Sequence, residues 1–379
     1  MKWSVILITA LAALVTATTV VWMEVRQERE FRRLVAKGDQ ALDAGRTSEA
    51  IEAFSGALAF KPDSMLAHLQ RAETYRRRGS DDLPAALRDA SEANALDPTA
   101  PQPIELLGDI HSAMGRYDEA VRHYGSYLQL DDDGTRVMYK LALAHVHQGK
   151  AKEALEPLTR AVSLDDRFVE AHYLMGVALR DLGRLDEAIK SLKLAVSLNA
   201  GFVPAREQLA EIYAARGPLR DALEQFEAMA ALESHRPERS VQVAAALSRT
   251  GQHEAAVLTV RRAIERHPDT PALYAALGRA WLVTAADYED PVALAKAIEA
   301  LQPLARRPDA DSESLSLLGE ALLMAGRVAD ADRVLQQAVS RQPVAPIAYR
   351  HLAEVARRRG RGAAAREAEA RHARLVPGS

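Results

Sequence analysis

The side chains best suited to bind a metal ion are the histidines His68, His145 and His172 and the acidic run Asp131–Gly134. Imidazole nitrogens suit zinc, and carboxylate oxygens suit calcium. The acidic run lacks the remaining ligands of a twelve-residue calcium loop. The three histidines fall on an apolar helical stripe that is described below. We therefore predict packed histidines and an acidic turn, with no metal site and no cofactor.

Catalytic motifs are also missing from the 379 residues. The chain has no cysteine, which excludes disulfides, thiolate nucleophiles and cysteine-ligated clusters. It contains no phosphate-binding loop with its lysine, no nucleophile elbow and no HExxH motif. The formal net charge of −3 provides no overall field that would attract nucleic acid. We predict that the protein is not an enzyme, and we expect neither a small-molecule substrate nor a nucleic-acid partner.

An internal repeat organises the chain instead. "GRYDEA" at 115–120 and "GRLDEA" at 183–188 begin 68 residues apart, which is twice 34. Steps of 34 from these glycines divide the chain into ten consecutive repeats, if two insertions are allowed. One insertion should lengthen the turn after Gly79, and the other, near 286–296, should lengthen the equivalent turn of the eighth repeat. The ten predicted repeats, first to tenth, are 31–64, 65–100, 101–134, 135–168, 169–202, 203–236, 237–270, 271–311, 312–345 and 346–379.

Each repeat has the pattern of two helices joined by a turn. With its first residue as position 1, positions 4, 7, 8 and 11 form one helical stripe. In the ninth repeat these positions hold Leu315, Leu318, Gly319 and Leu322. Gly or Ala at position 8 allows a close helix approach, and Gly at position 15 can end the first helix with a positive φ. Alanine is usual at positions 20 and 27, and Pro62, Pro98, Pro268 and Pro343 occupy position 32.

This pattern resembles the tetratricopeptide repeat (TPR), over residues 31–379. The resemblance implies an all-α fold: a right-handed α-solenoid of about ten helix–turn–helix units, whose first helices line a concave face. Such arrays bind proteins or peptides. Four residues depart from the pattern: Ala285 replaces the turn glycine, and Tyr127, Met229 and Leu304 replace the alanine of a second helix.

The first 30 residues differ from the repeats. Residues Trp3–Met23 contain no charge, and 21 uncharged, mostly apolar residues suffice to cross a bilayer core of about 30 Å. We therefore predict one transmembrane helix, with residues 1–30 as anchor and juxtamembrane segment. A signal peptide cleaved after Ala17 is the alternative, although the apolar run is longer than such peptides need.

The side of the membrane follows from charge. The cations after the span favour a cytoplasmic array by the positive-inside rule, in the inner membrane of a bacterium; a periplasmic array stays open. These cations are Arg26, Arg29, Arg32, Arg33 and Lys37. The layout is similar to that of the lipopolysaccharide assembly protein B family, but this chain lacks the cysteine-rich module of that family, so only the architecture is carried over.

A partner-binding groove is predicted on the first helices of the fourth and fifth repeats. Positions 2, 5, 9 and 12 lie on a face beside the packing stripe, and here they put apolar side chains between charged ones. The residues are Arg136, Tyr139, Leu143, Val146, Glu170, Tyr173, Val177 and Arg180. The alternative is that the two tyrosines pack locally. Chaperone-binding arrays of this family carry Lys at position 5 and Asn at position 9, and no repeat here does.

The resulting prediction for function is a membrane-tethered scaffold or adaptor that has no chemistry of its own and binds a protein or peptide. Two alternatives stay open. One is an adaptor in the assembly or regulation of the envelope or its lipopolysaccharide, and the other is a secreted periplasmic repeat protein.

Overall fold

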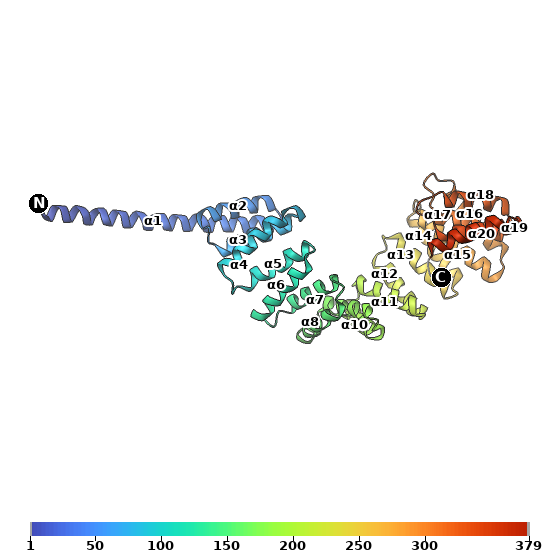
Figure 1. The fold of residues 1–379 in the computed structure, drawn as a ribbon, viewed down its shortest axis with the longest axis horizontal. Coiled ribbons are helices and arrows are strands. Elements are labelled where there is room, and N and C mark those ends of the chain that lie inside the picture. Colours follow the sequence, from blue (N-terminus) through green and yellow to red (C-terminus); the bar gives the residue numbers. More distant parts are fainter. Residues whose placement is uncertain (1, 377–379) are drawn as a thin grey trace. The chain divides into compact units, whose positions relative to one another are not determined.

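The structure, a computed structural model, describes the backbone of residues 2–376 and the side chains of residue 19 and residues 21–376. Within this part of the chain every regular element is helical, which confirms the predicted all-α class. Figure 1 shows the helices following one another as hairpins. The first ten are α1 (Lys2–Asp43), α2 (Thr47–Phe60), α3 (Met65–Arg78), α4 (Leu83–Leu96), α5 (Pro101–Ala113), α6 (Tyr117–Leu130), α7 (Thr135–His147), α8 (Ala151–Leu164), α9 (Val169–Asp181) and α10 (Leu185–Leu198).

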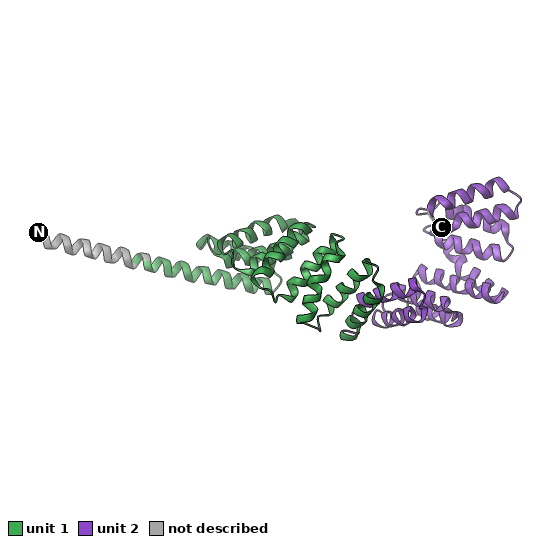
Figure 2. Ribbon diagram, turned by 60° about the horizontal axis from the view of Figure 1, so that its bottom comes forward, with its two compact units in different colours: residues 1–198 green, residues 199–379 purple. Residues whose placement is uncertain are grey.

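The remaining helices continue the same alternation. They are α11 (Val203–Arg216), α12 (Leu219–Leu232), α13 (Pro237–Arg249), α14 (His253–Arg266), α15 (Pro271–Tyr288), α16 (Pro291–Ala305), α17 (Ser312–Met324), α18 (Val328–Val339), α19 (Pro346–Arg358) and α20 (Gly362–Leu375). The chain forms two compact units, Met1–Leu198 and Asn199–Ser379, which Figure 2 colours separately. Each unit contains stacked helix pairs.

Glycine ends most first helices in the same way. Gly183 has a φ of 73°, and the N–H of Arg184 bonds to the carbonyl of Leu179 at 2.9 Å. The N–H of Gly183 bonds to the carbonyl of Arg180, also at 2.9 Å. This pair of bonds is the Schellman motif, which satisfies carbonyls that the helix end would leave unpaired. A residue with a Cβ would be strained at this φ, so the repeated glycine has a backbone cause.

The eighth repeat departs from this rule and corrects one expectation. We expected the insertion near 286–296 to lengthen the turn, but it lengthens the helices: α15 has 18 residues and α16 has 15, against 13 in α13 and 14 in α14. Ala285 stands where other repeats have the glycine that ends the first helix, so α15 continues to Tyr288. The chain then turns at Glu289, which has a φ of 49°. The earlier insertion forms a 3₁₀ turn, Ser80–Asp82.

Small residues at position 8 bring the two helices of a repeat together, as predicted. A Cβ on Gly176 would lie 2.6 Å from Cγ of Leu192, and one on Gly319 would lie 2.4 Å from Cδ2 of Leu335. Both distances are far below van der Waals contact, so each leucine fills the space that glycine leaves. The repeated glycine or alanine is therefore a condition for the hairpin to close.

Positions 3 and 10 are buried as well, which the sequence stripe had not included. Val137 and Ala144, at these positions of α7, pack against Ala120 and Tyr124 of the preceding α6. These positions therefore join one repeat to the next, whereas position 8 joins the two helices within a repeat. Position 10 is buried in every first helix from α3 to α19: Thr74, Ile110, Ala144, Ala178, Ile212, Ala246, Ala280, Ala321 and Val355.

A recurring hydrogen bond also links successive repeats through position 4. The Nε2 atoms of His68 and His172 lie 2.9 Å from the carbonyls of Pro62 and Asp166 at the end of the preceding repeat. Because a carbonyl can only accept, each imidazole donates. Arg206 donates in the same way to Ala200, at 3.0 Å. Packing and hydrogen bonding therefore account for His68 and His172.

No helix within the described part of the chain is both long and apolar enough to cross a membrane. The predicted span Trp3–Met23 lies largely outside the residues whose side chains are described. The backbone of α1 is helical from Lys2 to Asp43, so it enters the first repeat without a break.

Candidate protein-binding surfaces

The structure brings together several residues of the predicted groove on α7 and α9. The Tyr139 ring packs against Phe168 at a centroid distance of 5.4 Å. Burial, followed by the charge of Glu170 and the neighbouring Tyr173, raises the pKa of Tyr139. Leu143 and Tyr139 also pack against the core between α7 and α9. Tyr139 is thus partly committed to the fold.

The edges of this predicted groove are more open. Arg136 and Glu170 are exposed, whereas Tyr173, Val177 and Val146 are half-buried. Arg180 donates to Asp181 at 2.7 Å. The surface therefore mixes half-buried apolar groups with charges, and its role as a groove stays a prediction.

The neighbouring third repeat carries acids that already have partners within the fold. Lys140 of α7 donates to Glu105 at 2.7 Å and to Asp109 at 2.8 Å. The Tyr124 hydroxyl donates to the same Asp109 carboxylate at 2.8 Å. Burial, together with that carboxylate, raises the pKa of Tyr124. The acids at positions 5 and 9 of this repeat therefore serve to join α5, α6 and α7.

Sequence reasoning missed an apolar hollow on α13, α15 and α17. It has a volume of about 700 Å³. Most of its floor is alanine from α13 and α15, namely Ala244, Ala245, Ala272, Ala275, Ala276 and Ala280, with Val241 and Val283 beside them. Arg249, Arg279 and Glu313 stand at its margin. All three lining helices are first helices of consecutive repeats, so the hollow lies on the face that the resemblance assigns to partners. We call it the alanine groove.

Fixed charges hold the margin of the alanine groove. Arg279 of α15 forms an ion pair with Glu313 of α17. Arg249 donates to the carbonyl of Ala214 at 3.0 Å. Arg358 occupies the equivalent position of the last repeat and donates to the carbonyl of Leu323 at 2.8 Å. The bond of Arg249 therefore recurs between repeats and helps to hold them together. The margin is charged, whereas the floor is not.

A signal for the alanine groove was present in the sequence. Positions 5 and 9 of the seventh repeat hold Val241 and Ala245, and position 5 of the eighth holds Ala275. These positions hold tyrosine or charged residues in several other repeats. The predicted groove rested on large apolar side chains, whereas a hollow forms where side chains are small.

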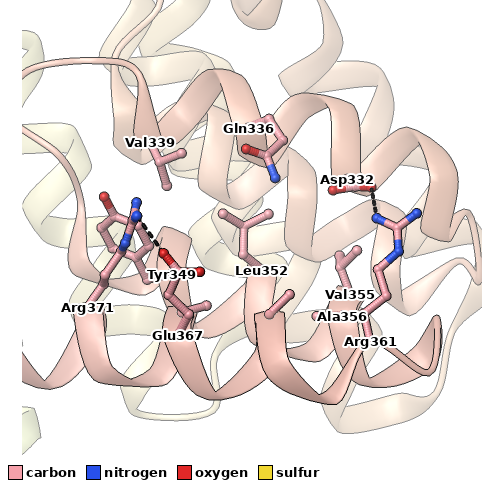
Figure 3. A pocket seen from close by; sticks show the side chains of 12 residues that line it. Asp332, Gln336, Val339, Tyr349, Leu352, Val355, Ala356, Arg361, Glu367 and Arg371 are labelled. Carbon is pink, nitrogen blue, oxygen red and sulfur yellow. Dashed lines mark hydrogen bonds and ion pairs between the residues drawn. The ribbon is translucent and has the colours of Figure 1, made fainter.

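A smaller and more polar hollow of about 240 Å³ lies between α18, α19 and α20. Figure 3 shows its two arginines turned toward acids. Arg371 donates to Glu367 at 2.7 Å, and Arg361 lies 4.0 Å from Asp332. Because both cations already have partners, this hollow offers less to a ligand than the alanine groove.

Comparisons with known families agree with this architecture. Two models described as "Tetratricopeptide repeat" match this chain, one at residues 35–101 and 325–379 and the other at 312–337. A model described as "Anaphase-promoting complex, cyclosome, subunit 3" matches residues 113–195.

Curated relatives match shorter stretches. Small glutamine-rich tetratricopeptide repeat-containing protein 2 of Mycosarcoma maydis is 32% identical over 99 residues, which is 26% of this chain and 28% of that protein. Hsp70-Hsp90 organizing protein 3 of Arabidopsis thaliana is 29% identical over 113 residues, which is 28% of this chain and 20% of that protein. The chain thus spans between a fifth and somewhat over a quarter of the length of these relatives.

A solved structure covers more of the chain. The tetratricopeptide repeat protein from Parabacteroides merdae ATCC 43184 aligns with 66% of this chain and 99% of its own, with a TM-score of 0.50 and 16% identity. At this identity the likeness shows the fold alone. Together with the family models and the stacked hairpins, it shows that the chain belongs to the tetratricopeptide-repeat family.

Proposed function

We propose that the protein is a non-catalytic scaffold that holds a segment of another protein in the alanine groove. The supporting observation is the floor itself, which consists mainly of alanines from α13 and α15 in a hollow of about 700 Å³. Such a surface accepts large apolar side chains from a partner, and apolar anchors in a pocket supply most binding energy at interfaces. The partner segment therefore carries several large aliphatic or aromatic side chains.

The charged margin adds a second feature of the partner. Arg249 and Arg279 line the groove together with its alanines, and Glu313 already pairs with Arg279. Charges at the margin of an interface set orientation and association rate more than affinity. The partner segment is thus apolar at its centre and mixed in charge at its edges.

Chaperone tails fit this chain poorly. One relative is named as an organiser of Hsp70 and Hsp90. No repeat here has the Lys at position 5 and Asn at position 9 that chaperone-binding arrays carry. An acidic tail would also gain little from a floor of alanines. We therefore propose an apolar partner segment instead.

We further propose that the scaffold is tethered to a membrane by residues Trp3–Met23, with the repeats on the cytoplasmic side. The length of the uncharged run and the cations that follow it support this placement. Resistance of the full chain to alkaline carbonate extraction, with an unprocessed N-terminus by mass determination, is the expected result. A mature chain that starts near residue 18 would instead indicate a secreted protein.

The groove is tested with a photocrosslinking amino acid placed at Ala272, which is exposed on the groove floor. We expect adducts in the native membrane with a segment rich in large apolar residues. The double substitution Ala245→Glu and Ala272→Glu, with the crosslinker moved to Ala275, should abolish them. Both alanines are exposed, so the fold should tolerate glutamate.

Ala295→Glu with Ala329→Glu is the matched control, since both alanines are exposed on second helices. Adducts that survive the groove variant unchanged would overturn the groove assignment. The pair Tyr139→Ala and Tyr173→Ala tests the surface predicted from sequence in the same assay. Loss of adducts in that variant alone would move the binding site to α7 and α9.

A further inference from the structure

Helix α1 carries a row of cations that the scaffold function does not use. Arg26, Arg29, Arg33 and Lys37 recur at intervals of three and four residues, which places them on one face of the helix. All four are exposed. The row extends over about 17 Å, given the rise of ~1.5 Å per residue. We call it the α1 basic stripe.

The stripe faces away from the repeat that α1 belongs to. Gly38 on the other side of α1 meets the ring of Phe54, and Leu34 meets Gly56, both on α2. The side of α1 that packs against α2 is therefore occupied, and the cations are turned outward. They do not contribute to closing the first hairpin.

Few acids neutralise the stripe. Glu30 pairs with Arg33 at 2.9 Å; the Arg33 side chain remains largely exposed, and that of Glu30 is partly exposed. Glu28 instead pairs with Lys61 and Arg32, and these two cations lower the pKa of its carboxyl. Within the described residues, no ion-pair partner is recorded for Arg29 or Lys37. The outer face of α1 is therefore net positive in a chain whose overall charge is −3.

Large apolar side chains lie exposed at the N-terminal end of the stripe. Trp22 is 60% exposed, Met23 58% and Val25 45%. The Arg26 guanidinium lies over the Trp22 ring, 5.4 Å from its centroid. Tryptophan beside arginine is typical of side chains that reside at the boundary between acyl chains and headgroups.

A hollow of about 550 Å³ adjoins this end, between α1 and the last turn of α2. Val25 and Phe60 supply apolar walls. Arg29, Arg32 and Lys61 stand beside them with Glu24 and Glu28, and Glu28 pairs with Arg32 and Lys61. The apolar walls suit the first part of an acyl chain, and Arg29 is the cation beside them that Glu28 does not hold. The hollow therefore extends the same chemistry from α1 to α2.

We propose that the α1 basic stripe and this hollow bind anionic phospholipid headgroups at a bilayer surface. Trp22 and Val25 lie at headgroup level, and Arg26 and Arg29, about 6 and 10 Å along the axis from Trp22, contact phosphates. Arg33 and Lys37 are about 16 and 22 Å from Trp22, two or more Debye lengths of ~8 Å, so their attraction to the bilayer is weaker. The inference rests on the membrane placement proposed above. Lipid is favoured over nucleic acid because the exposed apolar side chains beside the stripe can contact acyl chains, whereas a phosphodiester backbone offers them no apolar surface.

The test uses the full chain in zwitterionic detergent micelles, with native mass spectrometry to count retained phosphatidylglycerol and phosphatidylcholine. We expect several-fold more phosphatidylglycerol than phosphatidylcholine at equal supply, because screened attraction to anionic lipid adds up over several cations. The variant with Arg26, Arg29, Arg33 and Lys37 changed to Gln should lose that preference, and 0.5 M salt should reduce it in the wild type.

The matched control changes Arg220, Arg261, Arg262 and Arg266 to Gln, which removes the same charge from exposed positions of α12 and α14. Equal retention of the two lipids, or a preference that only the control loses, would overturn the proposal. So would a complex with a single-stranded RNA probe at physiological salt that depends on the stripe. Carbonate extraction separates the two ideas: an extracted chain contradicts the tether, whereas an inserted chain without lipid preference contradicts only the stripe.

Discussion

At the residue scale, position 8 shows how a missing side chain specifies a fold. Gly108 of α5 faces the buried Tyr124 ring, and a Cβ there would lie 2.4 Å from Cε1 of that ring. Tyr124 is held in place by its hydrogen bond to Asp109. The tyrosine cannot shift without losing that bond, so glycine is required at this position.

Gly108→Ala should therefore destabilise the array, by about 1–3 kcal/mol for an overpacked core. Gly125→Ala lies in the same repeat, where no atom lies within 4 Å of the added Cβ, and it should be neutral or stabilise by up to about 1 kcal/mol. Urea unfolding monitored by circular dichroism measures both. Similar effects of the two changes would contradict the close-approach role.

Two stacked histidines predict a pH dependence. The ring centroids of His111 and His123 lie 5.2 Å apart, and burial lowers the pKa of both histidines. The charge of His111 lowers the pKa of His123 further. The unfolded chain therefore binds protons more readily than the folded one just below pH 6.5, so stability falls as the pH drops through this range. His123→Phe keeps an aromatic ring in the stack and removes one titrating group.

We expect the melting temperature of the wild type to fall between pH 7.5 and 5.5, and that of His123→Phe to fall less. His267→Phe, which changes a histidine in a turn between repeats, is the comparison and should leave the wild-type fall unchanged. If the melting temperature of His123→Phe falls as steeply with pH as that of the wild type, the stacked pair does not determine the loss of stability in acid.

At the element scale, the sequence predicted the helices because each boundary is set locally. A glycine with positive φ ends α9 at Gly183, and position 8 fixes the partner of each helix. The length of α15 could not be predicted in this way. Ala285 stands where other repeats have the glycine that ends the helix, and no other residue in the sequence marks where α15 ends. The chain reverses instead at Glu289, a residue with no sequence feature that marks it.

Glu289→Gly should stabilise the second unit, since a non-glycine residue with positive φ costs about 1–2 kcal/mol. Ala295→Gly, in the interior of α16, should instead cost about 1 kcal/mol. Thermal unfolding of both variants is the measurement. A lower melting temperature for Glu289→Gly would show that the Glu289 side chain stabilises the fold by more than its positive φ destabilises it.

At the scale of the whole molecule, the division into Met1–Leu198 and Asn199–Ser379 was not visible in the sequence, because all repeats follow the same rules. The alanine groove was missed for a related reason. A hollow depends on small residues from α13, α15 and α17 at once, and each of them is unremarkable within its own helix.

Two compact units predict stepwise unfolding, because repeats stabilise mainly their neighbours. Urea titration of residues 31–379 should show two unfolding transitions. Gly108→Ala should shift one of them, and Glu289→Gly should shift the other. Separate fluorescence probes in the two units report on each step. A single transition shifted by both variants would mean that the units unfold together.

The unbroken course of α1 from Lys2 to Asp43 has a mechanical consequence. A helix transmits rotation as a stiff shaft does, so one alanine inserted after Gln27 should turn the repeats by about 100° relative to Trp22, and seven should bring them back to within about 20°. Crosslinking yield from a probe at the exposed Arg136, which lies in the same compact unit as α1, should therefore vary periodically with the number of inserted residues, whereas a flexible connection would show no such periodicity.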